Sequence, residues 1–261
     1  MNSDKTIESR FSAAAKTYHK HASAQLAIAR NLAEMIKASK KTQTILEIGC
    51  GTGTLTKHLV NLFPNAEITA LDISRNMIEQ ATTNLEKLKT IRFVCQNAME
   101  FEASESFDLV CSSASLHWIT PLSSIMQKIY TFLKPGGSLI CSVMLAGTLG
   151  ELRNARNFVA PHKLPATELP TEQETVSAIL SSGLKVTEAR QLSLIEEYEN
   201  TASFLKVINA QGLTGGYPSR GTKPLTGHEI EALKCYYDAE YKSGNGVLAT
   251  YKACLITALK K

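Results

Sequence analysis

The sequence has no apolar run long enough to cross a bilayer, and its cysteines include no pair in C-x-x-C spacing. Because a membrane-spanning helix needs about 18–20 apolar residues in succession, we expect no membrane span. The six histidines also lack metal-ligand spacing, so we expect no metal site. We interpret the cysteines as free thiols in a reducing compartment, and Cys95, Cys111 and Cys141, which lie in apolar runs, as buried.

The net charge is also weak, and the first residues predict no secretory signal. A net charge of +4 is too weak to indicate nucleic-acid binding by itself. The first residues include Asp4 and Glu8 and lack the apolar core of a secretory signal. We therefore expect a cytoplasmic, monomeric protein that binds neither nucleic acid nor membrane. Its 261 residues suit one large domain, or one domain with an inserted lid.

What the sequence does contain is a glycine-rich turn at 49–53. An apolar run that carries Glu47 leads into Gly49, Gly51 and Gly53, and a helix-like segment follows. Glycine lets a ligand lie directly against such a turn, and open α/β sheets bind ligands at the ends of their strands. The spacing G-x-G-x-G differs from the dinucleotide fingerprint G-x-G-x-x-G, and a carboxylate at Glu47 would repel a pyrophosphate.

A second acid, Asp72, ends the next apolar run, where a carboxylate can bind both hydroxyls of a ribose. A ribose and a positive charge without a phosphate describe S-adenosylmethionine (SAM). A nicotinamide-dependent oxidoreductase is the alternative that the glycine spacing and Glu47 disfavour.

Strand-like and helix-like segments alternate from residue 44 to about 145, which predicts βαβ units and a parallel sheet. We expect a mostly parallel, seven-stranded α/β sheet with helices on both faces. The expected strands are 44–48, 67–71, 91–95, 107–111, 137–145, 184–198 and 247–259, and the expected helices are 7–37, 54–62, 75–88, 122–132, 148–158 and 172–182, with two more within 200–242. The domain prediction is a helical N-terminal cap at 1–40, a core at 41–199 and 246–261, and a helical lid at 200–245.

Four segments resemble the motifs of class I SAM-dependent methyltransferases, in that family's order. They are Leu46–Gly53, Leu71–Ser74, Phe107–Val110 and Leu133–Gly137. The resemblance implies a Rossmann-like methyltransferase fold, SAM as cofactor and S-adenosylhomocysteine as product.

The same resemblance implies a role for each cofactor residue. Glu47, through water, and the turn would hold the methionyl group, Asp72 the ribose, and residues after the next two strands the adenine and the sulfonium. The implied cofactor residues are Glu47, Gly49, Cys50, Gly51, Gly53, Asp72, Ile73, Met77, Asn97, Ala98, Ser113 and Leu116.

A narrower resemblance covers nearly the whole chain. Arg10–Ala15 with Tyr18 and His21, Leu116–Trp118, Gly147–Leu152, Gly221–Leu225 and Thr250–Ala253 are similar to malonyl-acyl-carrier-protein O-methyltransferases of biotin synthesis. It implies methylation of the free carboxylate of a malonyl thioester on acyl-carrier protein or coenzyme A. His117 departs from this family, which usually has glutamine there.

A carboxylate acceptor is ionised near neutral pH, so we assign no general base. An arginine and a tyrosine hydroxyl are suitable ligands for it. The candidate acceptor residues are Tyr18, His21, His117, Trp118, Arg153 and Arg220. Other small-molecule methyltransferases, acting on an aconitate-type carboxylate or a quinone precursor, remain open, as does a non-catalytic SAM-binding protein.

Overall fold

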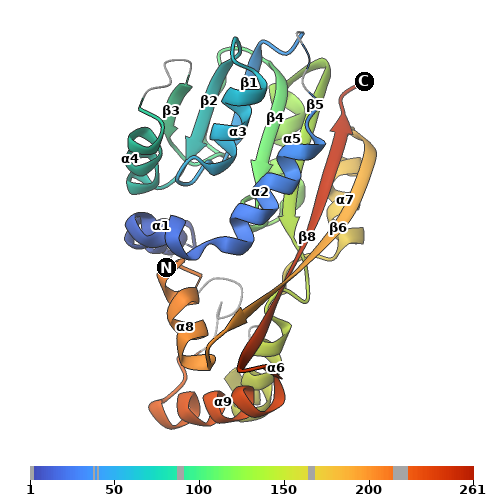
Figure 1. Ribbon diagram of the computed structural model, residues 1–261. Helices are drawn as coiled ribbons and strands as arrows, with labels where there is room; N and C mark the ends of the chain where they lie inside the picture. The colour runs from blue at the N-terminus through green and yellow to red at the C-terminus, as the bar shows by residue number, and fades with distance from the viewer. Residues whose placement is uncertain (1–2, 38, 40, 87–90, 164–167, 214–222) are drawn as a thin grey trace.

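The computed structural model describes residues 3–37, 39, 41–86, 91–163, 168–213 and 223–261. Its centre is one mixed sheet in the order β3-β2-β1-β4-β5-β8-β6, with the short β7 paired to β8 (Figure 1). The first five strands run parallel, and β8 is antiparallel to β5 and β6. The strands are β1 (Thr44–Ile48), β2 (Glu67–Asp72), β3 (Ile91–Cys95), β4 (Phe107–Ser113), β5 (Leu133–Met144), β6 (Lys185–Tyr198), β7 (Lys242–Ser243) and β8 (Gly246–Leu259).

Helices cover both faces of this sheet, as the alternating sequence pattern predicts. On one face lie α2 (Ser23–Met35) and α3 (Thr54–Leu62), and on the other α5 (Leu122–Phe132) and α7 (Glu172–Ser181). Each pair buries an apolar stripe against the strands, so the sheet lies between two hydrophobic clusters. The fold prediction is confirmed; β7 and two short 3-10 helices, η1 (Leu116–Trp118) and η2 (Pro161–Lys163), were not predicted.

The N-terminal segment is two helices and not the single helix predicted at 7–37. Helix α1 (Ser3–His21) ends before Ala22, whose φ of −95° and ψ of 42° are not helical, and α2 then begins at Ser23. The break turns α1 across the ends of the parallel strands, while α2 packs on the sheet (Figure 1). Helix α4 (Arg75–Asn84), also shorter than predicted, lies against α1.

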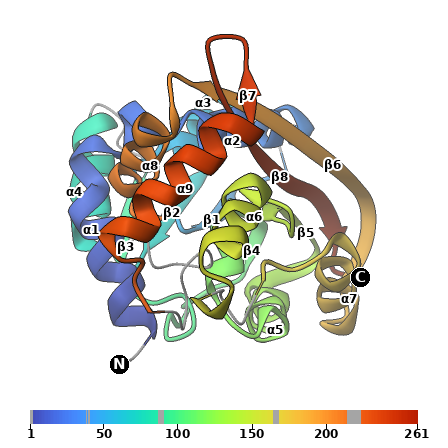
Figure 2. The ribbon, with the colours of Figure 1, turned by 90° about the horizontal axis from the view of Figure 1, so that it is seen from below.

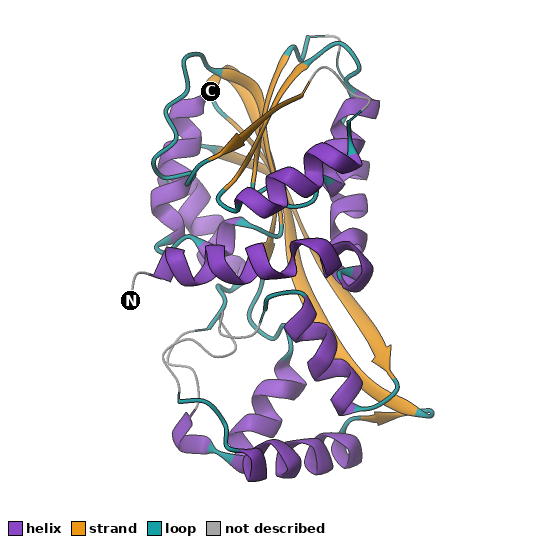
Figure 3. Cartoon of the chain, turned by 90° about the vertical axis from the view of Figure 1, so that its left-hand side faces the viewer, coloured by secondary structure: helices purple, strands orange, loops and turns teal. Residues whose placement is uncertain are grey.

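Strands β6 and β8 continue well past the end of β5. They pair from Lys185 opposite Leu259 to Tyr198 opposite Val247, whereas β5 reaches only Ala253 of β8. Three helices lie beside this two-stranded extension, below the sheet in Figure 3 and toward the viewer in Figure 2. These helices are α6 (Gly150–Val159), α8 (Thr201–Ala210) and α9 (Gly227–Glu240).

The cysteines are free thiols, as predicted, but the structure corrects the burial of one of them. Cys111 and Cys141 are buried on central strands, whereas Cys95 is exposed. The reason is that β3 is an edge strand, so its apolar sequence does not place every side chain inside. No described helix is both long and apolar enough to cross a membrane. Within the described ranges, no group of three or more His, Cys, Asp or Glu side chains is placed to hold a metal ion.

Candidate active site

The glycine turn joins β1 to α3 with three residues in the left-handed region. The φ angles are +72° at Gly49, +53° at Gly51 and +88° at Gly53. A Cβ added at Gly49 would lie 1.9 Å from the Ser115 Oγ, and one at Gly53 would lie 2.8 Å from a Leu85 methyl. A Cβ at Gly51 would meet nothing within 4 Å. At Gly49 the added Cβ would also lie 2.4 Å from the Ser115 Cβ, so packing disfavours any side chain there. At Gly53 it would meet only the flexible end of Leu85, and Gly51 leaves open space in front of the turn.

Asp72, at the end of β2, connects two turns through backbone hydrogen bonds. One carboxylate oxygen accepts the Gly51 N–H at 2.9 Å, and the other accepts the Ser74 N–H at 2.9 Å. Burial raises the pKa of Asp72, and these two hydrogen bonds act in the opposite direction. Because each carboxylate oxygen has two acceptor sites, Asp72 can still bind ligand hydroxyls beside Gly51.

Glu47 lies behind the turn and is 1% exposed. The Thr56 hydroxyl donates to its carboxylate at 2.6 Å. Burial raises the pKa of Glu47 to about 7, the Thr56 hydrogen bond lowers it and the nearby Asp72 charge raises it. Glu47 does not line the cavity in front of the turn, so it can act on a ligand only through the turn or through water.

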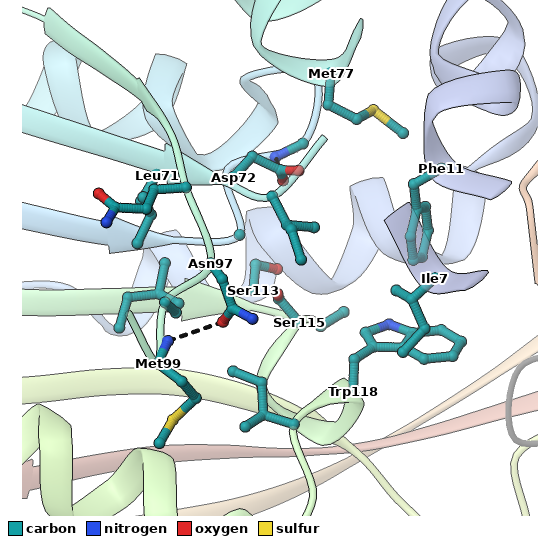
Figure 4. A pocket seen from close by; sticks show the side chains of 18 of the residues that line it. Ile7, Phe11, Leu71, Asp72, Met77, Asn97, Met99, Ser113, Ser115 and Trp118 are labelled. Carbon is teal, nitrogen blue, oxygen red and sulfur yellow. Dashed lines mark hydrogen bonds between the residues drawn. The ribbon is translucent and has the colours of Figure 1, made fainter. Parts of the chain in front are cut away.

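The cavity in front of the turn, called here the cofactor cavity, has a volume of about 210 Å³. Figure 4 shows it between the ends of the parallel strands and α1, with Phe11, Ile7 and Trp118 on the side opposite Leu71 and Asn97. The Asn97 side-chain oxygen accepts the Met99 N–H at 2.9 Å, which fixes this side chain at the cavity wall. The predicted cofactor residues that line the cavity are Gly49, Gly51, Asp72, Ile73, Met77, Asn97, Ala98 and Ser113.

The other predicted cofactor residues stand behind this wall. Cys50 is buried in the turn, where burial raises its thiol pKa well above the usual value, and Gly53 packs on Leu85. Leu116 is fully buried in the hydrophobic cluster beneath η1. Together with Glu47, these residues shape the turn and its support.

Helix α1 forms a wall that sequence reasoning did not assign to the cofactor. Ile7 and Phe11 line the cofactor cavity. The Phe11 and Trp118 rings pack edge-on, with their centroids 5.4 Å apart. The Ser12 and Ser74 hydroxyls are 2.8 Å apart, and the Asn76 side chain donates to the Ser12 carbonyl at 3.0 Å. These contacts fix α1 over the cavity; the only sequence signal for them was Phe11 within the N-terminal motif.

A second, smaller cavity of about 50 Å³ adjoins the first and is called here the acceptor cavity. Phe11, Tyr18, Ala114 and Trp118 line both cavities. The other residues of the acceptor cavity are Gln25, His117, Met144, Thr148, Leu149, Leu169, Leu213 and Tyr251.

Two residues of the acceptor cavity hold strained backbone conformations. The φ angles of Ala114 and Leu149 are +47° and +53°, which side chains other than glycine rarely adopt. The Ala114 N–H is held by the Ser142 hydroxyl at 2.9 Å. Such strain persists where surrounding contacts enforce it, often at a site where geometry matters.

Three of the six predicted acceptor residues line these cavities. Burial and the nearby Asp72 charge raise the pKa of the Tyr18 hydroxyl, so it stays protonated near neutral pH and can donate a hydrogen bond. Burial lowers the pKa of His117 to about 3, so its imidazole is neutral. Trp118 lines both cavities, and its ring centroid lies 5.1 Å from that of the His117 ring.

The other three predicted acceptor residues lie elsewhere. His21 lines neither cavity, and its carbonyl accepts a hydrogen bond from the Gln211 side chain. Arg153 on α6 forms an ion pair with Glu168 at 2.7 Å. Arg220 lies outside the described residues.

Known proteins resemble this chain in sequence over most of its length. The family model described as "Methyltransferase domain" matches residues 45–137. Malonyl-[acyl-carrier protein] O-methyltransferase 2 of Ilyobacter polytropus is 30% identical over 96% of this chain and 95% of its own. The chain belongs to the malonyl-[acyl-carrier protein] O-methyltransferase family. Another relative of that name, from Acetivibrio thermocellus, is 31% identical over 100% of this chain and 95% of its own.

Solved structures show the same methyltransferase fold at low identity. The N-methyltransferase NodS from Bradyrhizobium japonicum, in complex with S-adenosylhomocysteine, matches with a TM-score of 0.56 and 13% identity, over 100% of this chain and 99% of its own. A geranyl diphosphate C-methyltransferase from Streptomyces coelicolor matches with a TM-score of 0.55 and 14% identity, over 90% of this chain and 79% of its own.

The protein is therefore a SAM-dependent methyltransferase, and the residues of the cofactor cavity fit that cofactor. The open space at Gly51 admits a ligand against the backbone, and the Asp72 carboxylate stands beside it for ribose hydroxyls. The nicotinamide and non-catalytic alternatives are set aside.

Proposed function

We propose that the protein methylates the free carboxylate of a malonyl thioester, with malonyl-acyl-carrier protein as substrate, at an early step of biotin synthesis. The observation that carries this proposal is the wall that the two cavities share. It holds one protonated hydroxyl, on Tyr18, among apolar side chains, which suits an acceptor that needs a hydrogen-bond donor and no base. The names of the full-length relatives support the same acceptor.

SAM, when bound, supplies a methyl group activated by a positively charged sulfur. Transfer of this methyl group from the sulfur to one oxygen of the malonyl carboxylate would release neutral S-adenosylhomocysteine and would need no proton to move. We propose that the Tyr18 hydroxyl donates to the other carboxylate oxygen and orients the attacking one. Helix α1 is fixed over the site at Ser12, and we propose that it excludes water from the bound substrates.

The chemistry of His117 favours a carboxylate over a phenolic acceptor. A quinone precursor must lose a hydroxyl proton, and a buried imidazole with a pKa of about 3 is a weak base for that step. An aconitate-type carboxylate can accept the same hydrogen bond from Tyr18. Only recognition of the carrier arm can therefore distinguish a malonyl thioester from such an acceptor. We retain Arg220 as a proposed carboxylate ligand and the segments 1–40 and 200–245 as the proposed cap and lid.

The test is methyl transfer from labelled SAM to a panel of acceptors. We expect label in a base-labile ester with malonyl-acyl-carrier protein, and a comparison with malonyl-CoA identifies the preferred carrier. Acetyl-acyl-carrier protein is the matched control because it has the same arm and no free carboxylate. Labelling of aconitate or of a quinone precursor, with none of a malonyl thioester, would contradict the proposal.

A further inference from the structure

Gln25 on α2 lines the acceptor cavity and carries an unusual polar atom. Its side-chain oxygen Oε1 is buried, and none of the residues that the structure describes donates a hydrogen bond to it. A buried acceptor without a donor destabilises the folded state, so its place on a residue that lines a ligand cavity calls for an explanation. Gln25 lines the acceptor cavity and not the cofactor cavity, so it lies away from the reacting methyl group.

The orientation of the Gln25 amide is fixed by two further groups. The Gln211 side chain is fully buried, and its NH₂ group donates to the His21 carbonyl, the last residue of α1. A carbonyl can only accept, so the Gln211 oxygen must point the other way, toward Gln25. The Gln25 NH₂ group donates to that oxygen at 3.4 Å, which leaves its own oxygen on the remaining side. Rotating either amide would set two oxygens against each other.

Other polar side chains of this cavity already have partners within the protein. The Thr148 hydroxyl donates to the Lys252 carbonyl at 2.9 Å and accepts the Lys252 N–H at 3.0 Å. The Tyr251 hydroxyl lies 3.0 Å from the Tyr198 hydroxyl. The Gln25 oxygen therefore requires a donor from the ligand, and the malonyl part of the substrate has none, since its carboxylate and thioester carbonyl only accept.

We infer that the Gln25 side-chain oxygen accepts the first amide N–H of the carrier arm, two carbons beyond the thioester sulfur, and so selects pantetheine-type thioesters over free dicarboxylates. This inference rests on the proposed function, because it presumes a malonyl thioester in the acceptor cavity. It assigns the selection to a neutral hydrogen bond and not to the charge of the carrier. The same contact recognises the arm of acyl-carrier protein and that of coenzyme A.

The experiment exchanges a single atom of the substrate. S-malonyl-N-acetylcysteamine carries the amide, and S-malonyl-2-acetoxyethanethiol has an ester oxygen in place of its N–H. We expect the wild type to methylate the amide with a kcat/KM about tenfold above that of the ester, the size of one lost hydrogen bond. Gln25→Met keeps the side-chain length and removes the acceptor, so we expect it to treat both substrates alike. Gln173→Met, the same exchange at an exposed position on α7, serves as the control and should keep the tenfold preference.

A wild-type ratio near one would overturn the inference, as would a Gln25→Met variant that keeps the preference. The wild-type ratio decides the matter by itself if the variant does not fold. If no malonyl thioester is methylated, malonyl-acyl-carrier protein included, the proposed function is refuted and this inference with it. Methylation of both analogues at equal rates would refute the inference alone.

Discussion

The two cavities are built in different ways, although they share a wall. The polar groups of the cofactor cavity belong largely to turns at strand ends, held by the Asp72 carboxylate. The acceptor cavity is formed by side chains from segments far apart in the chain, such as Gln25, Met144, Leu213 and Tyr251. Cofactor binding therefore depends on local backbone geometry, whereas acceptor choice depends on how distant segments pack together.

This contrast explains how one fold can serve many acceptors. Residues such as Leu169 and Leu213 can change the acceptor cavity and leave the turn at 49–53 in place, because they do not line the cofactor cavity. Variants of the two cavities should therefore separate cofactor affinity, acceptor use and stability.

The largest effect is expected at Gly49, where backbone geometry and packing act together. In Gly49→Ala the new Cβ would lie 1.9 Å from the Ser115 Oγ, at a φ of +72°. We expect a loss of about 3 kcal/mol in the free energy of unfolding, from left-handed strain and overpacking. Urea unfolding at constant pH measures it.

Gly51→Ala is the matched control, because its φ of +53° carries strain but its Cβ would meet nothing within 4 Å. We expect a loss of about 1 kcal/mol of stability. Its affinity for S-adenosylhomocysteine should fall because the methyl group occupies space that the cofactor uses. Equal losses of stability in the two variants would show that the Ser115 contact relaxes without cost.

Most residues of the cofactor cavity could be predicted from the sequence, because they lie in short motifs at the ends of consecutive strands. The spacing of Gly49, Gly51 and Gly53, followed by Asp72 at the end of the next strand, is set within consecutive βα units. Parallel strands bring these turns to one edge of the sheet whatever the rest of the chain does. Residues such as Glu47 and Leu116 belong to the same motifs but lie behind the cavity wall, a distinction that spacing does not make.

The acceptor side could not be predicted in the same way, because its contacts are between distant residues. Nothing in the alanine-rich N-terminal segment signals the break at Ala22, whose neighbour His21 is held by Gln211. The sequence predicted Arg153 as an acceptor residue, whereas in the structure it forms an ion pair with Glu168 at 2.7 Å. Leu169 and Leu213 fall in none of the motifs, and Tyr251 belongs to a motif more than 200 residues from Tyr18, so only the packed structure brings them to one cavity.

The next effect concerns the wall that both cavities share. Tyr18→Phe removes the hydroxyl and keeps the ring, whose centroid lies 6.3 Å from that of the Phe11 ring in an edge-on pair. A hydrogen bond to a charged acceptor contributes about 1.5–3 kcal/mol, so we expect kcat/KM for the acceptor to fall on the order of ten- to hundredfold. Affinity for S-adenosylhomocysteine, measured by calorimetry, should change little. A parallel loss of cofactor affinity would place the hydroxyl on the cofactor instead.

The raised pKa of Glu47 predicts that the stability of the ligand-free protein depends on pH. Burial raises its pKa in the folded protein from 4.5 to about 7. Between these values the folded state binds more protons than the unfolded state, so the contribution of Glu47 to stability decreases as the pH rises from about 4.5 to about 7. We expect Glu47→Gln to recover on the order of 2 kcal/mol at pH 7.5 relative to pH 5, as followed by urea unfolding of the ligand-free protein.

Cofactor affinity should change in the opposite direction, because an ionised Glu47 attracts the positively charged amino group of the ligand. Binding of S-adenosylhomocysteine should therefore strengthen in the wild type as the pH rises from 6 to about 7.5. The same measurement on Glu47→Gln should give a flatter profile. Identical profiles would assign the effect to Asp72, whose pKa burial also raises.

The smallest effect is expected far from the cofactor, where α9 begins. Lys163, 9% exposed, donates to the Glu229 carboxylate at 2.7 Å and to the Pro224 carbonyl at 3.1 Å. The Lys163 hydrogen bond, with those from Thr226, lowers the pKa of Glu229 from 4.5 to about 2. A lowered carboxylate pKa stabilises the folded state at pH values above the unfolded pKa, so this contribution is lost as the pH falls from about 4.5 to about 2.

Glu229→Gln should lose less stability than the wild type between pH 5.5 and pH 3 in urea unfolding. Glu231→Gln, at a more exposed pair with Lys234 on the same helix, should keep the wild-type slope. Since α9 lies outside the cofactor cavity, affinity for S-adenosylhomocysteine at pH 7 should be the same in all three proteins; a wild-type slope in Glu229→Gln would mean that the acid sensitivity arises elsewhere.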